Sequence, residues 1–116
     1  MQNLEDRTLE FAIRVRKFIL DIPKNMTIYE DGKQVVRSSG SIGANYIEAN
    51  ENLGVKDLSF RMKIARKEAK ETVYWFKIIK GSNNLNEELL AEIEYLIDEA
   101  NQLRKILSAI IIKLEK

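Results

Sequence analysis

The sequence predicts an all-α fold, an antiparallel up-down-up-down four-helix bundle built from one domain over residues 1–116. Apolar residues recur with a helical period in four segments, and no segment alternates apolar and polar residues for long enough to form a strand. Only short polar stretches separate the four segments. Helices joined by short connections lie antiparallel to their neighbours, and this favours a bundle.

The first segment repeats apolar residues every three or four positions and ends before Pro23. Asn3 is expected to cap its start, because a side-chain oxygen at this position accepts a hydrogen bond from a free backbone N–H of the first turn. The predicted core stripe of this segment consists of Leu4, Thr8, Phe11, Val15, Phe18 and Ile22.

The second segment is predicted to begin with a capping box from Thr27 to Glu30 and to end at Gly54. Within it, residues 37–49 read RSSGSIGANYIEA, which matches neither phosphate-binding glycine loop, since the spacing differs and no strand precedes it. The predicted core stripe consists of Val35, Ser39, Ile42, Tyr46, Ala49 and Leu53.

The third segment is predicted from about residue 55 to residue 80, with Gly81 as its stop. Its core stripe is Leu58, Met62, Ala65, Ala69, Thr72, Phe76 and Ile79. The fourth segment is predicted to begin with Asn84 as its cap. Its stripe is Leu89, Ile93, Leu96, Ala100, Leu103, Leu107, Ile110 and Leu114.

The glycine-containing part of the second segment has two helical faces. Ser39, Ile42, Gly43, Tyr46 and Ile47 are expected to face the core. The second face carries small, hydrogen-bonding residues where solvated faces usually carry long charged ones, so we expect it to contact another subunit, a ligand or another part of the chain. It consists of Arg37, Ser38, Gly40, Ser41, Ala44, Asn45 and Glu48. The alternative is close packing of two helices within one bundle.

Composition excludes several classes of site. The chain has no cysteine, which rules out a disulfide framework and a cysteine nucleophile, and no histidine, the commonest metal ligand and the most versatile acid–base group. Carboxylate chemistry stays open in principle, but no pair of acids stands out. We therefore predict no catalytic residues, no metal site and no cofactor.

Charge is uneven along the chain, although the net charge is only +1. Residues 55–80 hold eight Lys or Arg against three acids, and residues 85–116 hold four against seven. We expect the cationic run to contact nucleic-acid phosphates through Arg61, Lys63, Arg66, Lys67 and Lys70. The alternative is a solvated face whose cations pair with acids of the fourth helix, an arrangement worth little energy.

Several large apolar residues lie off the core stripes of the last two segments. Helices that are apolar on several sides are normally buried on several sides, which predicts self-association through these helices. The expected interface consists of Ile64, Trp75, Ile78, Ile106, Ile111 and Ile112. The alternative is a wide core stripe with scattered exposed residues.

No apolar run exceeds four residues, so we expect no membrane partner. The initial stretch, MQNLEDRTLEF, carries acids and lacks the apolar core of a secretion signal, so a cytoplasmic location is expected.

The segment VVRSSGSIGANYIEA, followed by a basic helix ending in KEAKETVYWFKII and an acidic-to-apolar last helix, resembles the small four-helix-bundle proteins encoded in bacterial 23S rRNA intervening sequences. The most specific part of the match is Arg37, Ser38, Ser41, Ile42, Gly43, Ala44, Asn45, Glu48 and Ala49. The chain is also similar to accessory variability proteins of diversity-generating retroelements. These resemblances imply a homopentamer and, from the second group, basic surfaces that bind nucleic acid and a reverse transcriptase.

Together these observations predict a non-enzymatic, oligomeric scaffold that contacts RNA or a nucleic-acid-processing protein. The alternative is a pure protein-interaction and assembly module that binds no nucleic acid and uses the small-residue face of the second helix.

Overall fold

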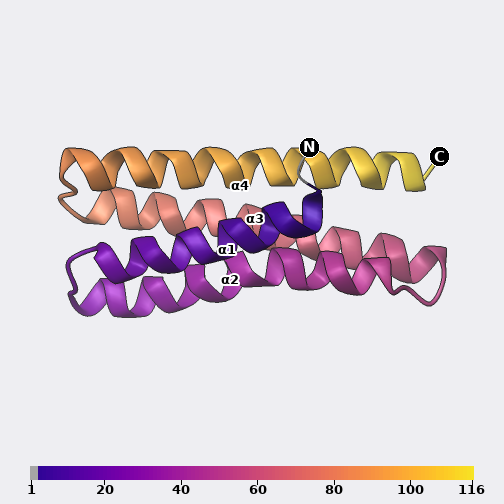
Figure 1. Cartoon of the computed structure of the whole chain (residues 1–116), viewed down its shortest axis with the longest axis horizontal. Coiled ribbons are helices and arrows are strands. Elements are labelled where there is room, and N and C mark those ends of the chain that lie inside the picture. The colour runs from indigo at the N-terminus through magenta and orange to yellow at the C-terminus, as the bar shows by residue number, and fades with distance from the viewer. Residues whose placement is uncertain (1–2) are drawn as a thin grey trace.

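The computed structural model describes residues 3–116 and contains four helices side by side (Figure 1). They are α1 (Leu4–Asp21), α2 (Met26–Asn50), α3 (Val55–Ser82) and α4 (Glu87–Leu114). Each helix packs against its neighbours in the order of the chain, and α1 closes the bundle against α4. The all-α four-helix bundle is confirmed. Residues 1 and 2 of the predicted domain lie outside the described range, and its boundaries stay a prediction.

The helices differ in length, so the bundle is uneven along its long axis of 45 Å. Figure 1 shows that α1 starts near the middle of α4 and ends beside the start of α4. Helix α1 packs more extensively against α2 than against α4. Only α2, α3 and α4 therefore form the end of the bundle that holds the α2–α3 connection (Figure 1).

The core follows the predicted stripes closely, with Val15, Val35, Ile42, Phe76 and Leu103 among its fully enclosed side chains. Helical periodicity alone fixes which residues share a face, so these assignments need no knowledge of the neighbouring helices.

Two core assignments are wrong, and one residue predicted for a subunit interface lies in the core. Leu53 lies beyond the end of α2 and is 95% exposed, and Ile47 turns outward from the same helix. Ile111, which was expected in a subunit interface, is buried in the core of the chain.

The helix starts combine one correct and two wrong predictions. Asn3 caps α1 as predicted, with its Oδ1 accepting from the backbone N–H of Asp6 at 2.8 Å. The expected capping box is wrong, because Asn25 Oδ1 accepts from the N–H of Ile28 and Thr27 lies inside the helix. Helix α4 is likewise capped by Asn86 and not by Asn84. Asparagines cluster at these loops, and local sequence does not decide which of them takes the cap.

The two glycine stops are also placed differently from the prediction. Gly54 precedes α3 with φ of +144°, a conformation that side chains disfavour, while α2 already ends at Asn50. Gly81 lies within α3, which ends one residue later. The following Asn83 donates a side-chain hydrogen bond to the carbonyl oxygen of Ile79 at 2.9 Å and satisfies one of the free groups at the helix end.

Candidate nucleic-acid interface

Four seams run between neighbouring helices of the bundle, and they differ in chemistry. They are the α3–α4 basic groove, which is rich in cations, the α2–α3 seam, the α1–α2 seam and the α1–α4 groove.

The α3–α4 basic groove is a hollow of about 420 Å³ on the surface between the last two helices. It is lined by Lys63, Arg66, Lys67, Lys70, Arg104 and Ser108. Arg66 and Lys67 each lie three or four positions from Lys63 and from Lys70, so the four residues share a face that extends about 10 Å along the helix. Helix α4 runs antiparallel to α3, which places Arg104 opposite this run. The groove thus gathers four of the five predicted cations.

Arg61 is the predicted cation that the groove does not include. Its Nε lies 3.6 Å from Oδ1 of Asp57, one turn earlier on the same helix. Sequence reasoning in turn missed Arg104 and Ser108, because they belong to a helix with a net negative charge. The sequence contained one usable signal. Arg104 directly follows the core residue Leu103, so its position on the helix places it beside the core stripe, on a flank of α4.

Most cations of the groove are not paired with an acid in the part of the chain that the structure describes. Lys63 Nζ pairs with Glu115 Oε2 at 2.6 Å, whereas Arg66, Lys67, Lys70 and Arg104 have no ion-pair partner within residues 3–116. Unpaired like charges repel one another, so the site is stabilised by any anion that enters it.

The expected pairing of α3 cations with acids of the fourth helix occurs at two positions within residues 3–116. In the described part of the chain only Lys63 with Glu115 and Lys80 with Glu94 join the two helices in this way. Other α4 acids face α1: Glu92 binds Arg14 and Glu99 binds Arg7. Glu92 and Glu99 are therefore directed away from the groove.

The α2–α3 seam uses its polar residues internally. Arg37 donates to Glu68 and Glu71, in both cases at 3.1 Å. The buried hydroxyls of Ser38 and Thr72 lie 2.8 Å apart and share a hydrogen bond. Two residues of the predicted partner-contacting face thus join helices of the same bundle, as the alternative interpretation expected.

The α1–α2 seam explains the glycines of the second helix. A Cβ atom at Gly43 would lie 2.7 Å from Thr8 Oγ1, so only glycine lets α1 approach this closely. At Gly40 the corresponding position lies 3.1 Å from a guanidinium nitrogen of Arg16. The two glycines are packing residues of the bundle.

The remaining members of the small-residue face are divided. Ser41 donates to the carbonyl oxygen of Arg37, and Asn45 donates to that of Ser41, so both bind their own helix. Ala44 and Glu48 are exposed. Ala44 lines a hollow of about 240 Å³ on the α1–α2 seam, together with Leu9, Ala12 and Ile47. Helix α2 therefore leaves an open apolar surface at this point.

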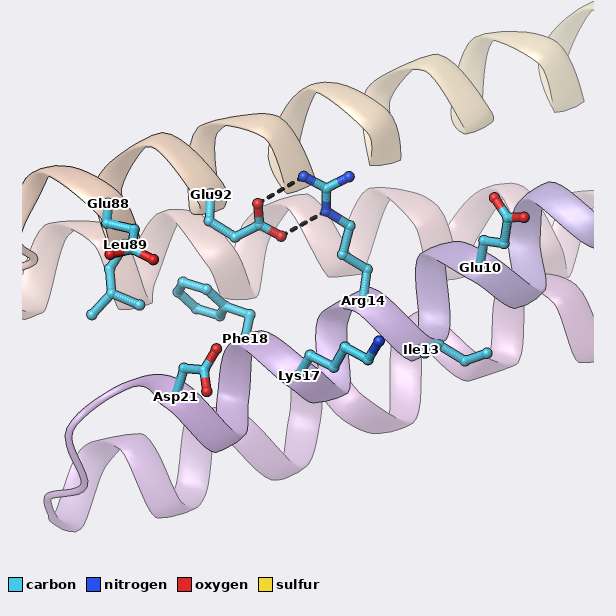
Figure 2. A pocket seen from close by; sticks show the side chains of 9 residues that line it. All are labelled: Glu10, Ile13, Arg14, Lys17, Phe18, Asp21, Glu88, Leu89 and Glu92. Atoms are coloured by element: carbon cyan, nitrogen blue, oxygen red, sulfur yellow. Dashed lines mark hydrogen bonds and ion pairs between the residues drawn. The ribbon is translucent and has the colours of Figure 1, made fainter.

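The α1–α4 groove is a hollow of about 510 Å³ (Figure 2). It is lined by Glu10, Ile13, Arg14, Lys17, Phe18, Asp21, Glu88, Leu89 and Glu92. Arg14 bridges it with two hydrogen bonds to Glu92, at 2.7 and 2.8 Å. The Arg14 guanidinium also lies 3.6 Å from the centre of the Tyr95 ring, a cation–π contact. Glu10 and Asp21 lie at opposite ends of the view and do not approach each other (Figure 2).

Hydrogen bonds between α1 and α4 raise the pKa of two arginines of α1. The hydrogen bond with Glu99 raises the pKa of Arg7, and the one with Glu92 raises the pKa of Arg14, in each case against the opposing effect of burial. No group of three or more acidic side chains among residues 3–116 is arranged to hold a metal ion.

The chain matches the model of the 23S rRNA-intervening sequence protein family over residues 3–109. It belongs to this family. A crystal structure of a protein of unknown function from the S23 ribosomal protein family of Bacteroides thetaiotaomicron VPI-5482 is similar, with 32% identity and a TM-score of 0.80. The similarity covers 94% of this chain and 98% of the other. No curated protein matches the chain.

Membership of the 23S rRNA-intervening sequence protein family confirms the resemblance expected from the motif around Arg37. The similarity to accessory proteins of diversity-generating retroelements is not confirmed and stays a prediction. Within residues 3–116 no helix is long and apolar enough to cross a membrane.

The interface predicted for this family member does not form one surface of the single chain. Ile64, Trp75 and Ile78 share the flank of α3 that bears the acids bound by Arg37. Ile106 lies four positions after Gln102, on the flank of α4 that contacts α1. Ile112 is exposed on α4, and Ile111 is in the core. Self-association itself stays a prediction.

Proposed function

We propose that this family member is a non-enzymatic, oligomeric scaffold of the cytoplasm that binds RNA through the α3–α4 basic groove. The observation that carries the proposal is the convergence of Arg66, Lys67, Lys70 and Arg104 in one groove, where none of them has an ion-pair partner among the described residues. A cationic groove of this kind displaces counterions from a phosphate backbone, and this release supplies most of the affinity of non-specific nucleic-acid binding.

The low net charge of the chain is compatible with this role, because the charges are segregated. Acids of α4 that would otherwise screen the groove are bound to Arg7 and Arg14 on the opposite flank of that helix. Repetition of the groove around an oligomer would place several such sites along one RNA and raise the overall affinity without new contacts.

A salt series tests the proposal. Fluorescence anisotropy of labelled 23S rRNA fragments should show binding at 50 mM salt that weakens steeply toward 200 mM. The double variant Lys67→Glu/Lys70→Glu should bind at least tenfold more weakly. The matched control is Lys17→Glu/Lys33→Glu, which reverses two exposed lysines on α1 and α2 and should bind like the wild type. Absence of binding at low salt, or equal effects of the two double variants, would overturn the proposal.

A second candidate function is a pure assembly module, and the apolar surface of the α1–α2 seam favours it. Leu9 and Ile47 are exposed beside Ala44, which suits a contact with a second copy of the chain or with a partner protein. Ala44→Glu should break an assembly that uses this surface, and light scattering should then show a lower mass. An unchanged mass would place the contact elsewhere.

The resemblance to pentameric proteins supports a homopentamer as the assembled form. Native mass spectrometry measures this directly. A mass of five chains is expected, and a monomer at micromolar concentration would contradict the oligomeric part of the proposal.

A further inference from the structure

Two exposed aromatic side chains lie on the line of cations along α3. Phe60, Lys67 and Tyr74 are each seven residues apart, and positions seven apart lie nearly above one another on a helix. Phe60 is 59% exposed and Tyr74 is 61% exposed, although rings of this size are normally much more buried. An aromatic ring therefore stands at each end of the cationic run.

The cations of the run lie between and beside these rings. Lys63 and Lys70 are one helical turn from Phe60 and Tyr74, respectively, on the flank that forms the α3–α4 basic groove. The acids nearest to Tyr74 are Glu71 and Glu68, which lie toward the other flank, where Arg37 binds both. Glu71 lies one helical turn from both Lys67 and Tyr74, but its charge is already paired with Arg37.

The core does not explain the exposed rings. The buried stripe of α3 passes through Met62, Ala65, Ala69, Thr72 and Phe76, on the opposite face of the helix. Tyr74 makes an edge contact with the Trp75 ring at 5.6 Å between centroids, and most of its surface stays open. Exposed rings beside unpaired cations are the combination that proteins use to bind single-stranded nucleic acid, because every base can stack on a ring whatever the sequence.

We propose that the basic groove and these two rings form one site for unpaired RNA, in which the cations hold phosphates and Phe60 and Tyr74 stack on bases. This inference rests on the proposed function, since it assigns the form of RNA that the groove binds. The rings are 14 residues apart, or about 21 Å along the helix, which is the rise of about six stacked nucleotides. Double-stranded RNA would reach the phosphate-binding cations but offers no free bases to the rings.

The test compares a 12-nucleotide unstructured RNA with a 12-base-pair RNA duplex by fluorescence anisotropy at 50 mM salt. The single strand should bind at least tenfold more tightly. Tyr74→Ala and Phe60→Ala should each weaken binding of the single strand by about five- to 150-fold, the range measured for single base-stacking rings. The salt dependence should be unchanged, because neither variant removes a charge.

Two conservative variants serve as controls. Tyr74→Phe keeps the ring and should bind like the wild type, whereas Phe60→Leu keeps an apolar side chain without a ring and should bind as weakly as Phe60→Ala. Circular dichroism and light scattering on each variant verify the fold and the mass of the assembly.

The outcomes separate this inference from the proposed function. Equal binding of single strand and duplex, with no effect of the ring variants but a strong effect of Lys67→Glu/Lys70→Glu, would overturn the stacking site and leave RNA binding intact. A lower assembly mass for Tyr74→Ala would assign the ring to a subunit contact and also overturn it. No binding of either RNA would overturn the proposed function.

Discussion

The two flanks of α3 differ in how their charged residues are satisfied. On the α2–α3 seam, Arg37 binds both Glu68 and Glu71, and the hydroxyls of Ser38 and Thr72 bind each other. On the α3–α4 basic groove, most cations have no partner within residues 3–116. Polar residues that are satisfied within the chain specify how the helices pack, and those that are left unsatisfied at the surface are available to a ligand.

The difference originates on the far side of the bundle. Helix α4 has enough acids to neutralise the groove, but Glu92 and Glu99 lie on the flank that faces α1 and bind Arg14 and Arg7. The net charge of each segment suggested that cations of α3 pair with acids of α4. The rotation of α4 about its axis decides which neighbouring helix each acid reaches.

The largest expected effect tests whether the glycines of α2 act only through packing. Gly43→Ala should lower the free energy of unfolding by about 1–2 kcal/mol, because overpacking costs about 1–3 kcal/mol and alanine regains up to about 1 kcal/mol of helix propensity. The added methyl group would press on Thr8, whose Oγ1 lies 2.7 Å from its position. Urea denaturation measures the change.

A second substitution provides the control for Gly43. Thr8→Ala removes Oγ1, the atom nearest to the new methyl group, and leaves Thr8 Cβ at 3.0 Å. The double variant should therefore be more stable than the sum of the two single changes indicates. If the two changes in the free energy of unfolding are strictly additive, the contact with Thr8 does not explain why residue 43 is glycine, and another cause, such as an external contact, is required.

The next effect concerns the paired flank of α3. Arg37→Ala should cost about 1 kcal/mol of folding stability, because Glu68 is only 8% exposed and loses a charged hydrogen bond, while the arginine itself is half exposed. Glu71→Ala, which removes the more exposed partner, should cost less than about 0.5 kcal/mol. Thermal denaturation compares the two, and RNA affinity should not change in either. A loss of RNA affinity without a loss of stability would mean that Arg37 belongs to the binding site.

A smaller and opposite effect is expected at Gly81. This residue lies in the last turn of α3, and a Cβ atom there would meet nothing within 4 Å. Gly81→Ala should therefore raise the free energy of unfolding by up to about 1 kcal/mol through helix propensity. If Gly81→Ala instead lowers the free energy of unfolding in the same urea assay, the glycine helps to end the helix, as the sequence predicted.

The smallest effect concerns a single cation of the groove. Arg104→Ala should weaken RNA binding about threefold at 200 mM salt and reduce the slope of log affinity against log salt by about one unit. Arg14→Ala removes an arginine that Glu92 already neutralises, so its slope should match that of the wild type. If Arg104→Ala and Arg14→Ala change the salt slope equally, paired and unpaired cations do not differ in RNA binding, which contradicts the account.

The sequence predicted the parts of this structure that depend on spacing within one helix. The stripes through Phe11 and Phe76 and the run from Lys63 to Lys70 follow from a period of 3.6 residues. Features that depend on a second helix could not be obtained in this way. The rotation of α4 about its axis decides which flank of α3 Arg104 faces. The rotation of α1 and α2 likewise decides how closely Thr8 approaches Gly43.

Loop chemistry was predictable in kind but not in position. Asn84 and Asn86 are equally good caps by residue type, and the start of α4 selects the second. The aromatic residues of α3 were interpreted by hydrophobicity alone, so Phe60 and Tyr74 were not considered as ligand contacts. Their heptad relation to Lys67 is visible in the sequence, but their exposure is not.

The most direct test of the central claim is lysine footprinting of the assembled protein with and without bound RNA. Acetylation with a soluble reagent, followed by mass spectrometry of peptides, reports the accessibility of each lysine. Binding through the α3–α4 basic groove predicts protection of Lys63, Lys67 and Lys70, with Lys17 and Lys33 still modified at their original rates. Protection of Lys17 and Lys33 with unchanged modification of the groove lysines would contradict the account.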